Sequence, residues 1–484
     1  MILGRVICEA RRIVSEEVIK NKKSFYGFAV LMALCSAAHV SVHLPKASLS
    51  IDWLLSVAVF VGSMGLIYRP SVRGLLGLAF LQVGHVVVDA PYNPDHWLLL
   101  FFVNLVTLGA ALRLWLRGQK ITPEILMETL LPGARLTFIV CYGFAAFAKY
   151  NSDFLFSEGS VARGLLEHQI GALPALSWIV WPPAAAWVAV ACETAVPMLL
   201  LFSRTRHIGI LVGVVFHAAL IISPAVKVYD FTIVVYTMLY LFTPESFDRN
   251  LQNWFAGVQK QAPHFTSLLC RFYHVLLVVL PVSLVVTSTQ FSLLEVPPQL
   301  VWLRWMVAMS VISCLGGLVF IGIFSGADRN STIAWLPRGG VAYAIVGLAI
   351  INGLCPYLGL KTQGSFTMFS NLRTEAGEWN HLIMPESIRV ADCYQDRLVK
   401  VVASNDSALN KKYVEPGLLA TEFEIRRRIM AEPTLALTVE RDGQEVVLDP
   451  AVQDPSLGNP LGPISRKLLI FRPVSPDGRP FITN

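Results

Sequence analysis

The chain has 484 residues, of which 54% are hydrophobic and 15% are charged, with a formal net charge of +6. Soluble globular proteins carry about 25% charged residues, so this composition excludes an ordinary soluble enzyme, a disordered chain and a free nucleic-acid-binding protein. The eight cysteines are scattered, with no CxxC pair and no metal-ligand spacing, so we expect neither a disulfide framework nor a metal site. A polytopic membrane protein with a small soluble domain remains.

The first predicted element, residues 1–25, is a polar and basic amphipathic segment on the inner membrane face. It lacks the apolar stretch and cleavage site of a signal peptide. Apolar runs of spanning length come after it. We predict eleven transmembrane helices, at residues 26–44, 51–68, 71–90, 96–116, 135–154, 178–203, 207–224, 228–243, 266–288, 300–325 and 341–359.

The distribution of basic residues supports alternating loops with the N-terminus inside. The predicted outside segments hold few lysines and arginines: Lys46, Lys149, Arg163, Lys227 and Arg304. The inside segments hold many more: Arg5, Arg11, Arg12, Lys20, Lys22, Lys23, Arg69, Arg73, Arg113, Arg117, Lys120, Arg135, Arg204, Arg206, Arg249, Lys260, Arg271, Arg329 and Arg338. This asymmetry agrees with the positive-inside rule, and eleven spans place the C-terminus outside.

Two connections mix charged and apolar residues at helical spacing, at 157–176 and 244–263. We expect both to lie on the membrane surface. The composition changes at about residue 361. There we predict a charged helix at 421–430 with solvated Arg426, Arg427 and Arg428, a hairpin at 434–449 around Asp442 and Gly443, and a strand at 467–472.

The predicted fold class is therefore an all-α polytopic membrane protein of about 11 transmembrane helices with a small C-terminal α+β extramembrane domain. Its three parts are the N-terminal segment at 1–25, the transmembrane domain at 26–360 and the extramembrane domain at 361–484.

Ionisable side chains inside spans are costly and mark functional sites by default. In the predicted topology they gather at the outer side, which indicates a polar cavity opening outward. Histidine and desolvated lysine can act as acids and bases near neutral pH. The residues concerned are His39, His43, His85, Asp89, His96, Lys149, Asp153, His168, His217 and Asp230.

Each of these residues also has a structural interpretation. Lys149 could extend to the lipid headgroups, and His96 beside Trp97 could be an interfacial anchor. His217 is better explained as a packed histidine bonded across helices. Glu193 lies near the middle of a predicted span, where a carboxylate must be protonated or paired, and a bond to a neighbouring helix is its favoured role.

Residues 142–154 form an aromatic, Ala- and Gly-rich span that ends in Lys149, with Asn151 and Asp153 after it. This stretch resembles a signature of the vitamin K-dependent γ-glutamyl carboxylase family, whose bacterial members are described as HTTM-domain proteins. Residues 89–98, with Asn93 and His96, resemble the family's Asn-x-His-aromatic-Leu segment. Residues 193–202 and 216–217 resemble its Glu…His helix pair, and residues 230–231 and 241–244 resemble the segments after that pair. The resemblance covers most of residues 20–260 and extends loosely through 352–357 and 366–373.

The resemblance implies that Lys149 acts as the base on a vitamin K hydroquinone, or another reduced quinone, and that His96 is its partner. O2 and CO2 would be co-substrates. We place His217, Glu193, Asp89, Asn93, Asn151, Asp153, His85 and Arg373 as supporting groups of the polar cavity.

Two departures bear on the reaction. Residues 364–369 replace the family's Tyr-x-Trp-Asp-Met-Met-like segment, and Ala148 stands where animal carboxylases have a second lysine. We therefore expect quinone oxidation with or without glutamate carboxylation.

The alternatives are a non-catalytic scaffold or peptide maturation and export partner, and a carrier, although no inverted repeat supports the carrier. The expected partners are the lipid bilayer and a peptide or protein substrate at the outer face, with no nucleic acid. We expect the bacterial cell membrane, a cytoplasmic N-terminus and a C-terminal domain on the periplasmic, extracellular or lumenal side.

Overall fold

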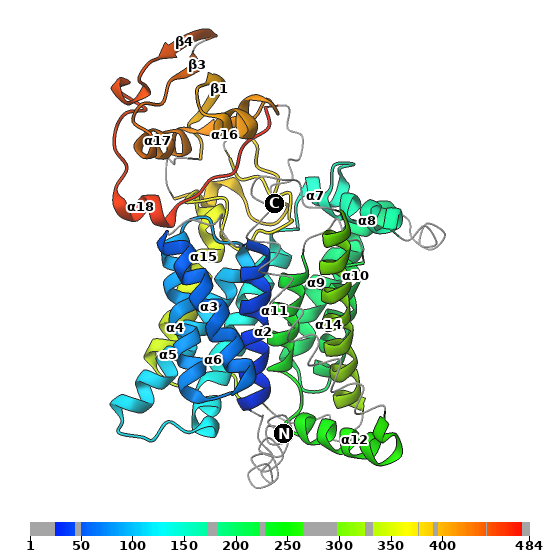
Figure 1. The fold of residues 1–484 in the computed structure, drawn as a ribbon. Coiled ribbons are helices and arrows are strands. Elements are labelled where there is room, and N and C mark those ends of the chain that lie inside the picture. Colours follow the sequence, from blue (N-terminus) through cyan, green and yellow to red (C-terminus); the bar gives the residue numbers. More distant parts are fainter. Residues whose placement is uncertain are drawn as a thin grey trace. The chain divides into compact units, whose positions relative to one another are not determined.

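A computed structural model of the chain describes residues 25–43, 50–172, 182–222, 228–264, 298–324, 333–375, 377–390, 395–441 and 443–476. These residues are mostly helical, with one small antiparallel sheet near the C-terminus (Figure 1). The coarse fold class predicted from the sequence is confirmed in this form. The predicted segment 1–25 and the predicted span 266–288 lie essentially outside the described residues.

Six described helical segments are long and apolar enough to cross a membrane. They are α3 (Ile51–Tyr68), α4 (Val72–Asp89), α5 (Asp95–Leu116), α6 (Pro123–Phe147), Pro182–Leu201, which contains α9 (Ala185–Leu201), and α15 (Gly340–Leu358). Large apolar side chains on them are exposed, among them Phe80 and Trp187. Exposed apolar residues at this density suit contact with lipid tails.

Three further predicted spans correspond to apolar helices that are not among these six. The helices α2 (Phe25–His43), α10 (Arg206–Leu220) and α14 (Pro298–Phe324) have 19, 15 and 27 residues, and the apolar stretch described in each has 17 residues or fewer. The predicted span 228–243 is α11 (Tyr229–Tyr240), 12 residues long and buried throughout from Thr232 to Tyr240. Hydropathy cannot distinguish a helix packed inside protein from one facing lipid, so eleven spans are not confirmed.

The predicted span 135–154 is placed differently. α6 begins twelve residues earlier, at Pro123, and ends at Phe147; a separate short helix, α7 (Ser152–Phe156), comes after a turn. The side chain of Asn151 accepts from the backbone N–H of Phe154 and so caps α7. The turn takes Lys149 out of the helix in which the sequence placed it.

The described chain divides into two compact units, each built from several separate stretches of sequence. The first unit contains residues from 1–83, 103–136 and 195–343, and the second contains residues from 84–102, 137–194 and 344–484. In the first unit α2 packs against α3 and α11. The second unit combines the end of α6, the start of α9 and the C-terminal tail, defined as residues 361–484.

The two connections predicted to lie on the membrane surface each contain a helix. They are α8 (Val161–Ala172) and α12 (Phe247–Gln261). α12 alternates apolar side chains with Asp248, Arg249 and Lys260, the pattern of a helix lying in a membrane interface.

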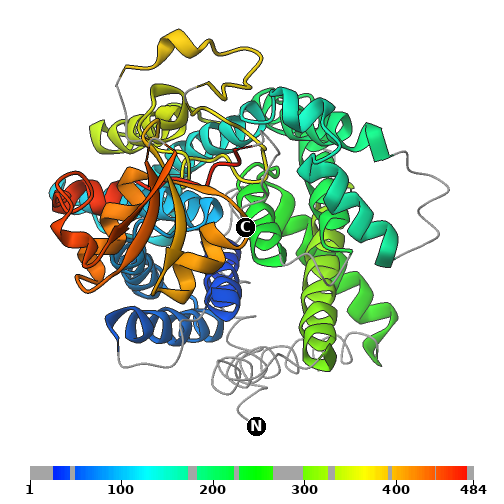
Figure 2. The same cartoon turned by 90° about the horizontal axis from the view of Figure 1, so that it is seen from above.

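The tail contains a four-stranded antiparallel sheet in the order β2–β1–β3–β4 (orange in Figure 2). The strands are β1 (Leu398–Ser404), β2 (Leu419–Thr421), β3 (Leu437–Arg441) and β4 (Gln444–Leu448), and the short helices α16 (Ser407–Leu409) and α18 (Pro463–Leu468) flank them. The predicted hairpin is confirmed as β3 and β4, with Gly443 at φ +77°. The predicted strand at 467–472 is wrong, since α18 covers its first two residues.

The predicted charged helix is α17 (Glu422–Ala431), but its arginines are not all solvated. Arg426 donates to the carbonyl of Asn459, and Arg427 pairs with Glu424 at 3.1 Å; both arginines are 9% exposed. Burial raises the pKa of Glu424. The sequence pattern could not show that residues 459–471 fold back over this face.

The β3–β4 end of the tail should lose stability in acid. Arg441 donates to both carboxylate oxygens of Asp454, at 2.7 and 2.9 Å, and its hydrogen bonds hold the pKa of Asp454 well below the ordinary range. A lowered folded-state pKa stabilises the fold above the unfolded value of about 3.9, and this contribution is lost as pH falls through that value toward the folded pKa. Hydrogen exchange at the amides of Ser456 and Leu457, which donate to Asp454, should accelerate below about pH 4. Asp454→Asn should remove this pH dependence, and equal acid sensitivity in that variant would contradict the assignment.

Candidate functional site

The second unit brings together Lys149 and Glu193, two of the predicted site residues. The Lys149 ammonium lies 2.8 Å from Glu193 Oε2, and the two side chains are 5% and 13% exposed. Lys149 lies just after the end of α6, and Glu193 lies on α9. The lysine is therefore buried against a carboxylate and does not extend to lipid headgroups.

Two backbone carbonyls complete the surroundings of the Lys149 ammonium. It donates to the carbonyl of Ala145, one turn back on α6, and to that of Met368, both at 3.1 Å. A lysine ammonium has three N–H donors, and these three acceptors match that number. Lys149 thus joins α6, α9 and the 364–371 loop at one point.

The 364–371 loop has an unusual backbone. Phe366, Phe369 and Asn371 have φ between +52° and +60°, and Gly364 has φ +61°. Bulky residues rarely adopt positive φ, and such strain persists where surrounding contacts over-determine it. Here the amide of Phe366 donates to Asp95 at 3.0 Å, and the Asn371 side chain accepts from the amide of Val161 at 2.9 Å. These contacts fix the position of the Met368 carbonyl.

Asn151 is fully buried and binds the same loop. Its amide nitrogen donates to the carbonyls of Ala148 and Ser370, at 2.8 and 2.6 Å. Its oxygen accepts from the Phe154 amide and from the side chain of Asn380. The Asn151 side chain thus holds the segment after α6 to the tail. Both its nitrogen and its oxygen have hydrogen-bond partners, as is usual for buried polar groups.

Asp153 and Arg373, also predicted site residues, form an ion pair of 2.7 Å between Arg373 Nε and Asp153 Oδ2. Arg373 additionally pairs with Glu378. Its backbone N–H donates to Asn380 at 2.7 Å. The ion pair attaches the segment that follows the 364–371 loop to α7, next to the turn that contains Lys149.

An aromatic cluster lies against the Lys149 turn. It contains buried Ala148, Tyr357 and Leu372, packed by Phe144, Phe147, Trp379, Met384 and Ile388. The Tyr357 side chain is fully buried, and its hydroxyl has no hydrogen-bond partner among the described residues. Buried hydroxyls normally have a partner, so a ligand oxygen is a natural acceptor or donor here.

His381 closes the cluster and gives a pH-dependent prediction. Its Nε2 lies 3.0 Å from the Phe147 carbonyl, and its Nδ1 accepts from the amides of Ile383 and Met384. Burial lowers the pKa of His381. The folded state therefore favours the neutral imidazole. The stabilisation of the fold by His381 is complete above the unfolded-state pKa of about 6.5 and is lost as pH falls below it.

Amide exchange at Ile383 and Met384, corrected for intrinsic rates, should therefore be faster at pH 5.5 than at pH 7.5. The variant His381→Ala should exchange fast at both pH values. Equal protection of the wild type at both pH values would contradict this role.

The predicted residues near α4 and α5 also lie in the second unit. Trp97 Nε1 donates to His85 Nδ1 at 3.2 Å, and the Asn93 side chain donates to the Val86 carbonyl at 2.9 Å. His96 is 5% exposed on the first turn of α5, and Asp89 ends α4. The described partners of Lys149 are Glu193 and two backbone carbonyls, and His96 is not among them.

His217 belongs to the first unit. It lies on α10, 1% exposed, with its ring packed edge-on against Phe231 at 5.0 Å. This agrees with a packed core histidine, the interpretation that the sequence favoured.

Several residues of the Lys149 site were not predicted from the sequence: Tyr357, Met368, Ser370, Asn380 and His381. Their contacts join positions more than 200 residues apart. The resemblance extends loosely over the segments that contain Tyr357, Met368 and Ser370, but a tyrosine near a helix end and a carbonyl in a loop give no periodic signal that would mark them as site residues.

The fold and this site define the chain as a multi-pass membrane protein with a buried lysine–glutamate pair at the end of a spanning helix. A scan against protein-family models and searches of curated proteins and of solved structures find no match to it.

Proposed function

We propose that this protein is a membrane enzyme that oxidises a reduced quinone with O2, in the manner of vitamin K-dependent carboxylases, with or without addition of CO2 to glutamate. The observation that carries the proposal is the buried Lys149–Glu193 pair beside the Tyr357 aromatic cluster. Intramembrane ionisable groups are costly and mark functional sites by default.

The surroundings fit a quinone. The cluster offers aromatic surface at Phe144, Phe147 and Tyr357, and the Tyr357 hydroxyl can hydrogen-bond a ring oxygen. The reduced quinone would supply the phenolic proton and, on oxidation to its epoxide, the four electrons that reduce O2, with one oxygen atom entering the epoxide and the other leaving as water. A lipid-soluble molecule would reach such a site from the bilayer.

Lys149 and Glu193 would divide the proton handling. Lys149 accepts a proton only as the neutral amine, so its ammonium must first lose one. Glu193, at 2.8 Å, is positioned to take that proton. The carbonyls of Ala145 and Met368 then keep the amine nitrogen in place by accepting its remaining hydrogens.

The proposed topology has the N-terminus in the cytoplasm and the tail outside, in a bacterial cell membrane. The basic residues on the predicted inner segments support it. The Lys149 site would then act at the outer side, where a peptide or protein substrate could bind.

The test is epoxide formation from vitamin K hydroquinone by the full chain in liposomes under O2, a reaction that yields one epoxide and one water. Lys149→Ala should abolish product, and Lys400→Ala, on an exposed lysine of β1, should leave it unchanged. Because Lys149→Ala also breaks the ion pair, Lys149→Arg tests the base with a cation retained and should also be inactive. A folded wild type that forms no product from vitamin K or another hydroquinone would overturn the proposal.

A second candidate is a non-catalytic scaffold or peptide maturation partner. The observation that favours it is the match of three acceptors to the three donors of Lys149. If the protein is a scaffold, wild type would show no quinone turnover, and Lys149→Arg would change only the stability of the protein.

A further inference from the structure

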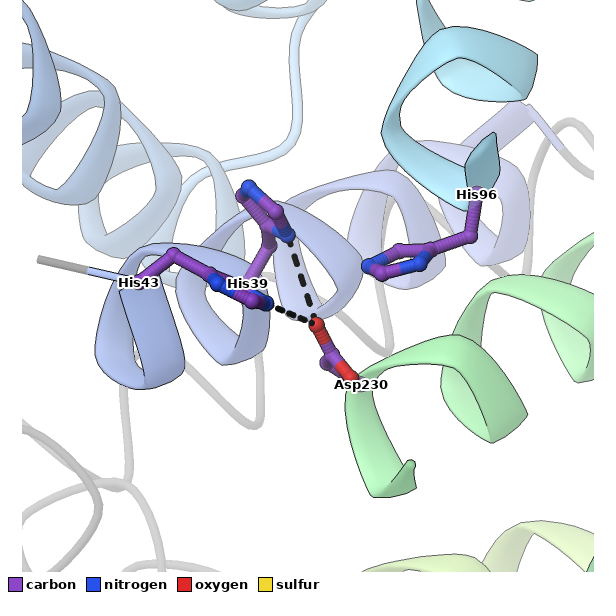
Figure 3. A group of neighbouring side chains, drawn as sticks. All are labelled: His39, His43, His96 and Asp230. Atoms are coloured by element: carbon purple, nitrogen blue, oxygen red, sulfur yellow. Dashed lines mark hydrogen bonds and ion pairs between the residues drawn. The ribbon is translucent and has the colours of Figure 1, made fainter. Parts of the chain in front are cut away.

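We propose that the first unit holds a divalent transition-metal site formed by His39, His43 and Asp230. His39 and His43 are one turn apart on α2, and Asp230 is in the first turn of α11 (Figure 3). This site goes beyond the proposed quinone chemistry and does not depend on it. The sequence predicted no metal site, because residues 39–43 and 230 are far apart in the chain.

The distances between the donor atoms fit coordination. His39 Nδ1 and His43 Nε2 lie 3.3 and 3.2 Å from the same oxygen, Asp230 Oδ2, and all three atoms lie within 4.8 Å of one another. Zinc bonds of about 2.0–2.2 Å in tetrahedral geometry place neighbouring ligand atoms about 3.3 Å apart. One ion can therefore replace the two histidine–aspartate contacts with little movement of the side chains.

The charge balance favours a cation. The side chains of His39 and Asp230 are each 2% exposed. Neither α2 nor α11 contains a lysine or an arginine. A buried carboxylate must be protonated, paired or bound to a metal, and two imidazoles facing one carboxylate oxygen form the two-histidine, one-carboxylate set of divalent metal sites.

The backbone around the site is fixed. Asp230 Oδ1 accepts the amide of Phe231 at 2.8 Å, which leaves Oδ2 directed at the histidines. Further along the same two helices, Cys35 Sγ and Thr237 Oγ1 are in contact at 3.0 Å, so α2 and α11 are held together. Metal sites depend on such supporting contacts to orient their ligands.

The site is accessible from one side. The His43 side chain is 42% exposed, while its two partners are buried. We therefore expect the site to bind a divalent ion of the first transition row. Zn²⁺ is the probe used to test it.

The experiment is calorimetric titration of Zn²⁺ into the full chain, purified in detergent with a histidine-free tag and treated with chelator. Wild type should bind one equivalent at this site, and Co²⁺ should give a visible d–d spectrum that Zn²⁺ abolishes. His39→Ala and Asp230→Asn should each weaken this binding at least about 100-fold, since losing even an outer-shell partner costs 10–100-fold.

Two further variants separate metal binding from folding. His43→Gln changes a half-exposed side chain, so it should keep the melting temperature of the metal-free protein and still weaken Zn²⁺ binding. His207→Ala, on a histidine of α10 in the same unit, should bind Zn²⁺ like wild type. If wild type shows no saturable binding, or if His39→Ala, His43→Gln and Asp230→Asn all bind like wild type, the site does not exist. These outcomes are independent of quinone turnover.

Discussion

Glu193→Ala should destabilise the protein by about 3–5 kcal/mol, the cost of leaving one charge of a buried pair without its partner. The Lys149 ammonium would retain the carbonyls of Ala145 and Met368 but no counter-charge. Equilibrium unfolding of the full chain in mixed detergent micelles, followed by tryptophan fluorescence, measures the change.

The double variant Lys149→Met/Glu193→Leu is the matched control. Apolar residues of similar volume often replace a buried ion pair without loss, so the double variant should recover most of the stability that either single variant loses. Losses that simply add in the double variant would show that the two groups are not coupled. Recovered stability without quinone turnover would separate the structural role of the pair from its proposed chemical role.

Asn151→Ala should destabilise the second unit by about 3–7 kcal/mol. The variant removes the cap of α7, worth about 1 kcal/mol, and it leaves the Ser370 carbonyl and the Asn380 side chain short of a partner, at about 1–3 kcal/mol each. Asn151 is 0% exposed, so water cannot replace these bonds without rearrangement. The same unfolding measurement applies, with hydrogen exchange at the Phe154 amide as a local readout.

Asn151→Asp distinguishes the cap from the network. Aspartate caps helices as well as asparagine does, so a capping role alone predicts little change. In the structure the Asn151 amide nitrogen faces two carbonyl oxygens, of Ala148 and Ser370, and a carboxylate there would be repelled. We therefore expect Asn151→Asp to be at least as destabilising as Asn151→Ala. Ser50→Ala, at the exposed N-cap of α3, should cost no more than about 1 kcal/mol.

The sequence identified features that depend on local pattern. Apolar runs of spanning length predicted five of the six long apolar helical segments and the second half of α6, and Asp442 with Gly443 predicted the β3–β4 hairpin. These signals are local because helix and hairpin formation depend on neighbours a few residues apart.

The structure differs from the sequence patterns where packing decided the outcome. α11 is as apolar as a spanning helix, but it has 12 residues and is buried among other elements. Arg426 and Arg427 occupy a charged helix face that later residues cover. Hydropathy measures how much a segment avoids water, and burial in protein and burial in lipid satisfy it equally.

The sequence by itself determined that this chain enters a membrane, and that Lys149, Glu193, Asn151, Asp153 and Arg373 are residues of interest. Only the tertiary structure decided their partners: Lys149 with Glu193, Asp153 with Arg373, and Asn151 with Ser370 and Asn380. It alone brought His39 and His43 to Asp230. The physical reason is that ion pairs, hydrogen-bond networks and metal sites join residues across long stretches of chain, and one-dimensional periodicity carries no signal for such contacts.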